Sequence, residues 1–177
     1  MKLNARSIAL CAVLTALALG LSTLENLFPV TLIVPLPGVK LGLANIVTVF
    51  ALYELGAVPA LTILTARCLL GGLFAGNLSA LLFSLLGGFT AMLVMIALKH
   101  CKGLSIYGVS IGGAAAHNIG QMAAALITLG NTAVLGYLPF LLAVSLFTGA
   151  LTGFVSALLL RAMSHVKLSH GRSADNG

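Results

Sequence analysis

A single arginine inside an apolar stretch is the residue of this chain best suited to bind a ligand. Arg67 lies within the apolar residues 57–74, where an ionised side chain is so costly that a functional role is the first hypothesis. The only acidic residues, Glu25, Glu54 and Asp175, lie at the ends of apolar stretches or in the tail, so we expect none to pair with Arg67. Its guanidinium is then expected to bind an anionic ligand, to cap backbone carbonyl groups or to reach the membrane surface.

A second group of polar residues lies in the apolar stretch 107–129. His117 and Gln121 are four residues apart and share one face of a helix, and Asn118 lies beside them. Two readings stay open, because these side chains could line a cavity or could only hold the helices together by interhelical hydrogen bonds. A neighbouring stripe of small residues suits close helix contact, and its members are Gly112, Ala116, Gly120 and Ala124.

The composition places these residues in a membrane. Of the 177 residues, 60% are hydrophobic and 7% are charged, and the mean hydropathy is +1.15. A soluble domain carries about 25% charged residues, so this chain cannot cover its surface with groups suited to water. At about 20 residues per crossing, its length allows roughly five to seven spans and no appreciable soluble domain.

Apolar stretches bounded by charged residues, Pro or Gly predict an all-α protein, a bundle of about six transmembrane helices. Glu54, Gly56 and Pro59 predict a tight turn between the second and third helices. We expect one domain over residues 1–165, followed by a polar cytoplasmic tail over 166–177. The apolar stretches are 6–24, 41–56, 57–74, 78–98, 107–129 and 137–161.

The distribution of basic residues orients this bundle. Cytoplasmic segments of membrane proteins carry an excess of Lys and Arg. With six spans and the N-terminus inside, only Lys40 among the basic residues of the loops and termini faces outside, which predicts that both termini are cytoplasmic. The basic residues on the inner side are then Lys2, Arg6, Lys99, Lys102, Arg161, Lys167 and Arg172.

With this orientation the polar residues of the spans gather near the middle of the membrane or in its outer half. The inner half holds little that is polar beyond Ser and Thr. A channel would need polar residues along its full depth, so the asymmetry predicts instead a pocket, open to the outside, for a small-molecule substrate. The predicted substrate-binding residues are Lys40, Asn45, Arg67, Asn77, His117, Asn118 and Gln121.

The connection between Glu25 and Lys40 is unlike the others. It is too short to cross the bilayer, and Pro29, Pro35 and Pro37 exclude a regular helix. Its apolar character leaves two readings open. It could dip into the lipid headgroups, or it could form a lid over a binding cavity.

Small side chains recur along one face of the first stretch. Such stripes allow helices to dock closely in lipid. Three readings stay open: packing inside the bundle, a homodimer, or docking to a different membrane protein. The partner-docking candidates are Ala9, Ala12, Ala16 and Gly20.

Signatures of enzymes, metal sites and nucleic-acid binding are absent from the sequence. There is no phosphate-binding loop ending in Lys-Ser or Lys-Thr, no HExxH motif and no pair of Asp residues for magnesium. Cys11, Cys68 and Cys101 lie far apart without a CxxC pair. We therefore expect no catalytic residues, no metal, no cofactor and no nucleic-acid partner.

Several segments together resemble one bacterial family. They are residues 37–48, 67–73, 84–88 and 108–121, which contain most of the polar residues named above. The family is catalogued as the Gx transporter family or as heptaprenyl diphosphate synthase component I. The resemblance covers the chain to about residue 162 and implies a location in the bacterial cell membrane.

That family is similar to the substrate-binding S components of energy-coupling factor (ECF) vitamin transporters. The similarity implies six helices, an outward-facing pocket covered by the first loop, and an AxxxA face on the first helix that docks a transmembrane coupling subunit. Ala12 and Ala16 match that face. Because the chain has no nucleotide site of its own, separate ATPases would power uptake of the small molecule.

The second name implies an alternative, a non-catalytic accessory subunit of heptaprenyl diphosphate synthase in the synthesis of the menaquinone side chain. Prenyl diphosphate synthases use Asp-rich magnesium motifs, whereas the only Asp here is Asp175. A catalytic partner would have to supply them. A secondary transporter acting alone is disfavoured, because the sequence has no inverted repeat and no acidic residue inside a span.

Overall fold

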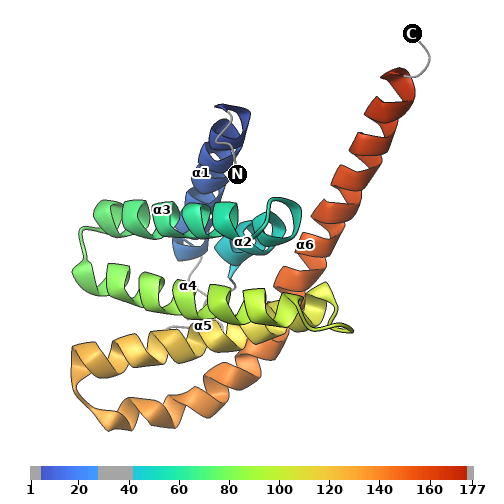
Figure 1. Cartoon of the computed structure of the whole chain (residues 1–177). Coiled ribbons are helices and arrows are strands. Elements are labelled where there is room, and N and C mark those ends of the chain that lie inside the picture. The colour runs from blue at the N-terminus through green and yellow to red at the C-terminus, as the bar shows by residue number, and fades with distance from the viewer. Residues whose placement is uncertain (1–4, 28–41, 175–177) are drawn as a thin grey trace.

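The computed structural model describes residues 5–27 and 42–174, and this part of the chain is helical without any strand. Figure 1 shows the helices in chain order. They are α1 (Ala5–Leu27), α2 (Leu43–Glu54), α3 (Ala57–Ala75), α4 (Leu78–Lys99), α5 (Ile106–Leu129), the short 3₁₀ helix η2 (Thr132–Tyr137) and α6 (Leu138–Ala174). The all-α class predicted from the sequence is confirmed for the described residues.

The helices end where the sequence offers caps and turn residues. Gly56, at φ 95°, separates α2 from α3, and Pro59 lies in the first turn of α3, where its missing N–H costs nothing. Asn77 begins α4, because its side-chain oxygen accepts hydrogen bonds from the N–H groups of Ser79, at 2.9 Å, and Ala80, at 3.3 Å. The tight turn predicted between the second and third helices is confirmed.

Within the described residues, six α-helices pack as a closed ring. Following the packed neighbours leads from α1 to α2, then to α6, α5, α4, α3 and back to α1. In Figure 1, α3, α4, α5 and the first half of α6 lie side by side. The last part of α6 extends away from the other helices toward the C-terminus.

Glycines allow the closest helix contacts in this ring. A Cβ atom on Gly120 of α5 would collide with the Leu86 carbonyl group and the Thr90 hydroxyl of α4, and one on Gly149 of α6 would lie 2.6 Å from the Ile111 Cα. Without these Cβ atoms the backbones approach closely, as small residues permit in membrane helices. The predicted role of the stripe around Gly120 in close helix contact is confirmed.

Four of the described helical segments are long and apolar enough to cross a membrane. They are Ser7–Glu25, Ala57–Ala75, Leu78–Lys99 and Thr132–Ser164. The apolar helix α2 has only 12 residues, and α5 carries the polar cluster at 117–121. The chain is therefore a helical membrane protein.

The sixth helix extends beyond its apolar stretch. The apolar stretch ends at residue 161, but α6 continues to Ala174 and has 37 residues. At 1.5 Å per residue it is roughly 55 Å long, well beyond the ~30 Å hydrocarbon core of a bilayer. The domain boundary predicted between residues 165 and 166 therefore falls inside a continuous helix.

Candidate functional site

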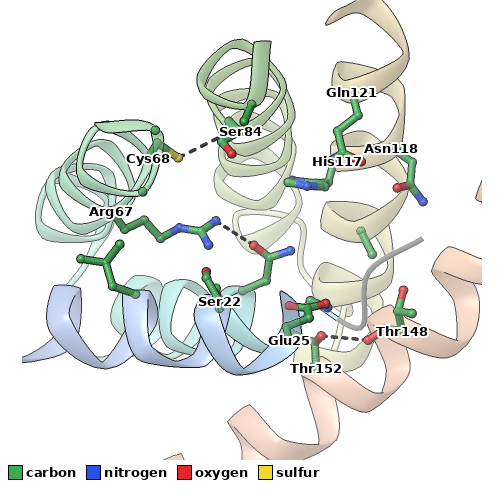
Figure 2. A pocket seen from close by; sticks show the side chains of 18 of the residues that line it. Ser22, Glu25, Arg67, Cys68, Ser84, His117, Asn118, Gln121, Thr148 and Thr152 are labelled. Carbon is green, nitrogen blue, oxygen red and sulfur yellow. Dashed lines mark hydrogen bonds between the residues drawn. The ribbon is translucent and has the colours of Figure 1, made fainter. Parts of the chain in front are cut away.

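A polar pocket lies inside the ring of helices, and all six α-helices contribute to its wall (Figure 2). Its volume is about 170 Å³, below the ~300–1,000 Å³ of pockets that hold drug-sized ligands. Such a pocket suits a small ligand or one compact group of a larger ligand. The polar side chains that line it are Ser22, Glu25, Asn45, Arg67, Ser84, His117, Asn118, Gln121, Thr148 and Thr152.

Arg67 projects from the second half of α3 into this pocket. Its Nη2 donates a hydrogen bond to Asn45 Oδ1 of α2 at 3.0 Å. A guanidinium has five N–H groups, and this is the only hydrogen bond that Arg67 makes within the described part of the chain. Its Nε is buried without a hydrogen-bond partner there, a condition that costs about 1–3 kcal/mol for a buried polar group.

Glu25 lines the same pocket as Arg67, although it stands near the end of the first apolar stretch in the sequence. It lies on the last turns of α1, is only 8% exposed, and its Oε1 accepts a hydrogen bond of 2.7 Å from the N–H of Gly42. Gly42 precedes α2 in a left-handed conformation, with φ 77°, which favours glycine. The carboxylate therefore connects the end of α1 with the start of α2, 17 residues later.

His117 and Gln121 line the pocket from α5, in a space that Gly87 of α4 leaves open. A Cβ atom on Gly87 would lie 2.9 Å from both His117 Cε1 and Gln121 Cγ. Asn118 also lines the pocket, and its Nδ2 donates a hydrogen bond of 2.8 Å to the Leu141 carbonyl of α6. Both roles considered for this cluster are therefore present. Its side chains line a cavity, and Asn118 also makes an interhelical hydrogen bond.

Of the seven predicted substrate-binding residues, five come together at this pocket: Asn45, Arg67, His117, Asn118 and Gln121. Asn77 does not line it, because its side chain caps α4 and is exposed. Lys40 lies outside the described residues, as does the predicted lid or interfacial loop between Glu25 and Lys40.

Sequence reasoning missed five of the polar residues in the pocket wall, namely Ser84 of α4 and two pairs on α1 and α6. Ser22 and Glu25 are three residues apart and share a face of α1, and Thr148 and Thr152 are four residues apart and share a face of α6. That helical spacing was a signal available in the sequence. The threonines were inconspicuous, because hydroxyl groups in apolar helices commonly bond to their own backbone.

The small residues of α1 lie on its outer surface. Ala9, Ala12, Ala16 and Gly20 are all exposed, and no atom lies within 4 Å of the position of a Cβ on Gly20. Leu14 and Ala18, on another face of the helix, are buried. The described helices therefore do not pack against this stripe, and docking to another copy or to a different protein stays a prediction.

The described residues offer few groups that could form a metal site or a disulfide. No three His, Cys, Asp or Glu side chains come together there as a metal site would need. The three thiols are free, and Cys68 donates a long hydrogen bond, 3.4 Å, to the Ser84 carbonyl.

The fold and the pocket define a helical membrane protein with a polar cavity between its helices. The chain belongs to the heptaprenyl diphosphate synthase component I family, because the model of that family matches residues 14–159. The resemblance found in the sequence is thereby confirmed. Component I is the non-catalytic subunit, in agreement with the expectation that the chain is not an enzyme. No curated protein and no solved structure matches the chain.

Proposed function

We propose that this chain is a non-catalytic membrane subunit that binds a small molecule through an anionic group, with Arg67 as the counter-charge. The observation that carries the proposal is the guanidinium in the pocket wall, which makes one hydrogen bond, to Asn45. A partly buried arginine that makes a single hydrogen bond within the described residues is best satisfied by charge-assisted hydrogen bonds to a carboxylate or phosphate.

The topology that fits this function has six spans, both termini in the cytoplasm and the pocket toward the outside of a bacterial cell membrane. The pocket residues of α1 and α3 lie in the second halves of those helices, and those of α2 and α4 in the first halves, as one end of an up-and-down bundle requires. Helix α2 is only about 18 Å long, so it would cross only part of the bilayer. Reporter fusions at residue 177 and within 130–136 should report opposite sides.

Membership of this family favours the catalytic subunit of a prenyl diphosphate synthase as the first candidate partner. As an accessory subunit of heptaprenyl diphosphate synthase, the chain would act with a catalytic subunit that supplies the Asp-rich magnesium site, because its own sequence has only Asp175. A diphosphate would then be the anionic group. The small pocket fits such a headgroup, while the apolar chain of a prenyl compound would lie in lipid.

The second candidate is an S component-like subunit for uptake of a small molecule, with a transmembrane coupling subunit and ATPases as partners. The pocket inside a ring of six helices supports this candidate. The exposed stripe of Ala9, Ala12, Ala16 and Gly20 also supports it, because small residues on a membrane helix permit close docking.

Substitutions of Arg67 test ligand binding. Small molecules that remain with the purified wild type, Arg67→Lys and Arg67→Met would be quantified by mass spectrometry, and melting temperatures measured in detergent. We expect an anionic compound with the wild type, about tenfold less with Arg67→Lys because the planar fork is lost, and none with Arg67→Met. The Met variant should remain folded, because the substitution removes a charged group that makes a single hydrogen bond to the described residues. A destabilised Met variant that retains the compound would contradict the proposal.

Co-purification tests the partner. Tagged wild type and Ala16→Leu would be isolated from membranes, and their partners identified. A prenyl synthase subunit supports the first candidate, and a coupling subunit with ATPases supports the second. Ala16→Leu adds bulk to an exposed position and leaves the pocket untouched, so it should lose the partner and keep the bound compound. If Ala16→Leu retains its partner fully, the stripe does not dock it.

A further inference from the structure

The pocket contains two opposite charges that are not paired with each other. Arg67 donates to the amide oxygen of Asn45 at 3.0 Å, and Glu25 accepts from the Gly42 N–H at 2.7 Å. Figure 2 shows Glu25 next to Thr152, with no hydrogen bond between it and Arg67. Each charge is therefore held by a neutral group and faces the space that a ligand would occupy.

Among the described residues, the two threonine hydroxyls beside Glu25 have their hydrogens engaged and offer acceptors to the pocket. The Thr152 hydroxyl donates its hydrogen to the Thr148 carbonyl at 2.8 Å, and the Thr148 hydroxyl donates to the Val144 carbonyl at 3.3 Å. Each hydroxyl has a single hydrogen, so both oxygens remain as acceptors next to the carboxylate. Figure 2 shows Glu25, Thr148 and Thr152 gathered at this side.

The side around Arg67 has the opposite character, because a guanidinium has donors and no acceptor. A ligand with only negative charge would be attracted by Arg67 and repelled by Glu25, since both line one cavity of about 170 Å³. A ligand that also carries a positive group would satisfy both sides.

We propose that the pocket selects a compact amphoteric ligand, with its anionic group on Arg67 and an ammonium-type donor on Glu25, Thr148 and Thr152. This inference rests on the proposed anion binding at Arg67 and names the ligand as amphoteric, which disfavours a prenyl diphosphate because that compound has no ammonium group. An ammonium group has three donors and no acceptor, which matches one carboxylate and two hydroxyl oxygens. The short span of the cavity limits the spacer between the two charges to a few atoms.

Matched pairs of probes test this inference on the full-length protein in detergent. Calorimetry would compare β-alanine with propionate, γ-aminobutyrate with butyrate, and phosphoethanolamine with ethyl phosphate. The carboxylate and phosphate pairs distinguish the two sources of the anionic group. We expect the amino member of at least one pair to bind about tenfold more tightly, the size of effect that one charge-assisted hydrogen bond produces.

Glu25→Gln should remove this preference by weakening only the amino member, because the amide oxygen still accepts from Gly42 while the charge is lost. Glu54→Gln is the matched control, since it removes a carboxylate that does not line the pocket; it should keep the preference. A melting temperature near that of the wild type would show that Glu25→Gln is folded.

The outcomes separate the two proposals. Equal binding of amino and non-amino members, or a preference that survives in folded Glu25→Gln, would overturn the amphoteric ligand and leave anion binding intact. If the wild type binds none of the probes at millimolar concentration, the amphoteric ligand is overturned. If Arg67→Met binds every probe as tightly as the wild type, or retains the compound that co-purifies with it, the proposed binding function fails as well.

Discussion

Two cations hold the short helix α2 at its opposite ends, and they do so in different ways. Lys99 of α4 donates a 2.7 Å hydrogen bond to the Leu52 carbonyl at the end of α2, and its ammonium lies 4.9 Å from the centre of the Tyr53 ring. Arg67 of α3 bonds to the Asn45 side chain at the start of α2. The lysine is exposed and has conventional protein partners, whereas the arginine lies in a pocket with donors to spare.

The surroundings of Lys99 and Arg67 also differ, since one is apolar and filled and the other is polar and open. Near Lys99 the ends of α2 and α4 and the start of α5 meet in an apolar core, with Leu52, Met95 and Val109 at most 3% exposed. Around Arg67 the helices leave a polar cavity instead. One end of the ring is thus filled by its own side chains, and the other end encloses a polar cavity. The sequence predicts that the polar residues of the helices gather toward one side of the membrane, and that orientation stays a prediction.

Among the substitutions that test this comparison, Gly87→Ala is expected to have the largest effect on ligand binding. The new methyl group would lie 2.9 Å from His117 Cε1 and Gln121 Cγ and 3.1 Å from His117 Nδ1, so both side chains must move into the pocket. We expect binding of the compound that remains with the wild type to weaken about tenfold or more, while the melting temperature changes little. The helix gains about 0.5–1 kcal/mol from replacing Gly by Ala, which offsets part of the crowding.

Gly71→Ala is the matched control, since Gly71 also lines the pocket on a neighbouring helix. Its added methyl group would meet only Leu19 Cδ2, at an ordinary 3.7 Å. Binding should therefore change less than about twofold, within the ±0.5 kcal/mol typical of benign substitutions. Equal losses of binding in the two variants would show that the space beside His117 has no special importance.

The sequence predicts the helices well, because each apolar stretch is interrupted by residues that end a helix. Gly56, Gly76 and Gly130 each stand next to a predicted end, and all three have positive φ. The end of α6 is not predicted, since hydropathy marks where lipid contact stops and not where a helix stops. No Pro or Gly interrupts the chain between residue 161 and Gly171, so the helix continues into the polar tail.

The site is only partly predictable for a different reason. Arg67, His117 and Gln121 stand out in the sequence because polar residues are costly inside spans. Glu25 lies at the boundary of its apolar stretch and looks like an interfacial residue. Its spacing from Ser22 indicates only a shared face of α1, whereas its hydrogen bond with Gly42 is a long-range contact that the sequence does not reveal.

The smallest effect on ligand binding is expected from Lys99→Met. This variant tests whether the Lys99 end and the Arg67 end of α2 are independent of each other. The substitution removes a hydrogen bond to the Leu52 carbonyl and a cation–π contact with Tyr53. Each interaction is worth about 0.5–1.5 kcal/mol when exposed, so we expect unfolding free energy to fall by about 1–2 kcal/mol in a reversible denaturation assay. Ligand binding should be unchanged, because the apolar core separates Lys99 from the pocket.

Lys102→Met, at another exposed lysine just beyond α4, controls for the loss of charge and should leave both the unfolding free energy and ligand binding unchanged. A Lys99→Met variant that loses binding at unchanged stability would mean that α2 transmits changes from one end of the ring to the other.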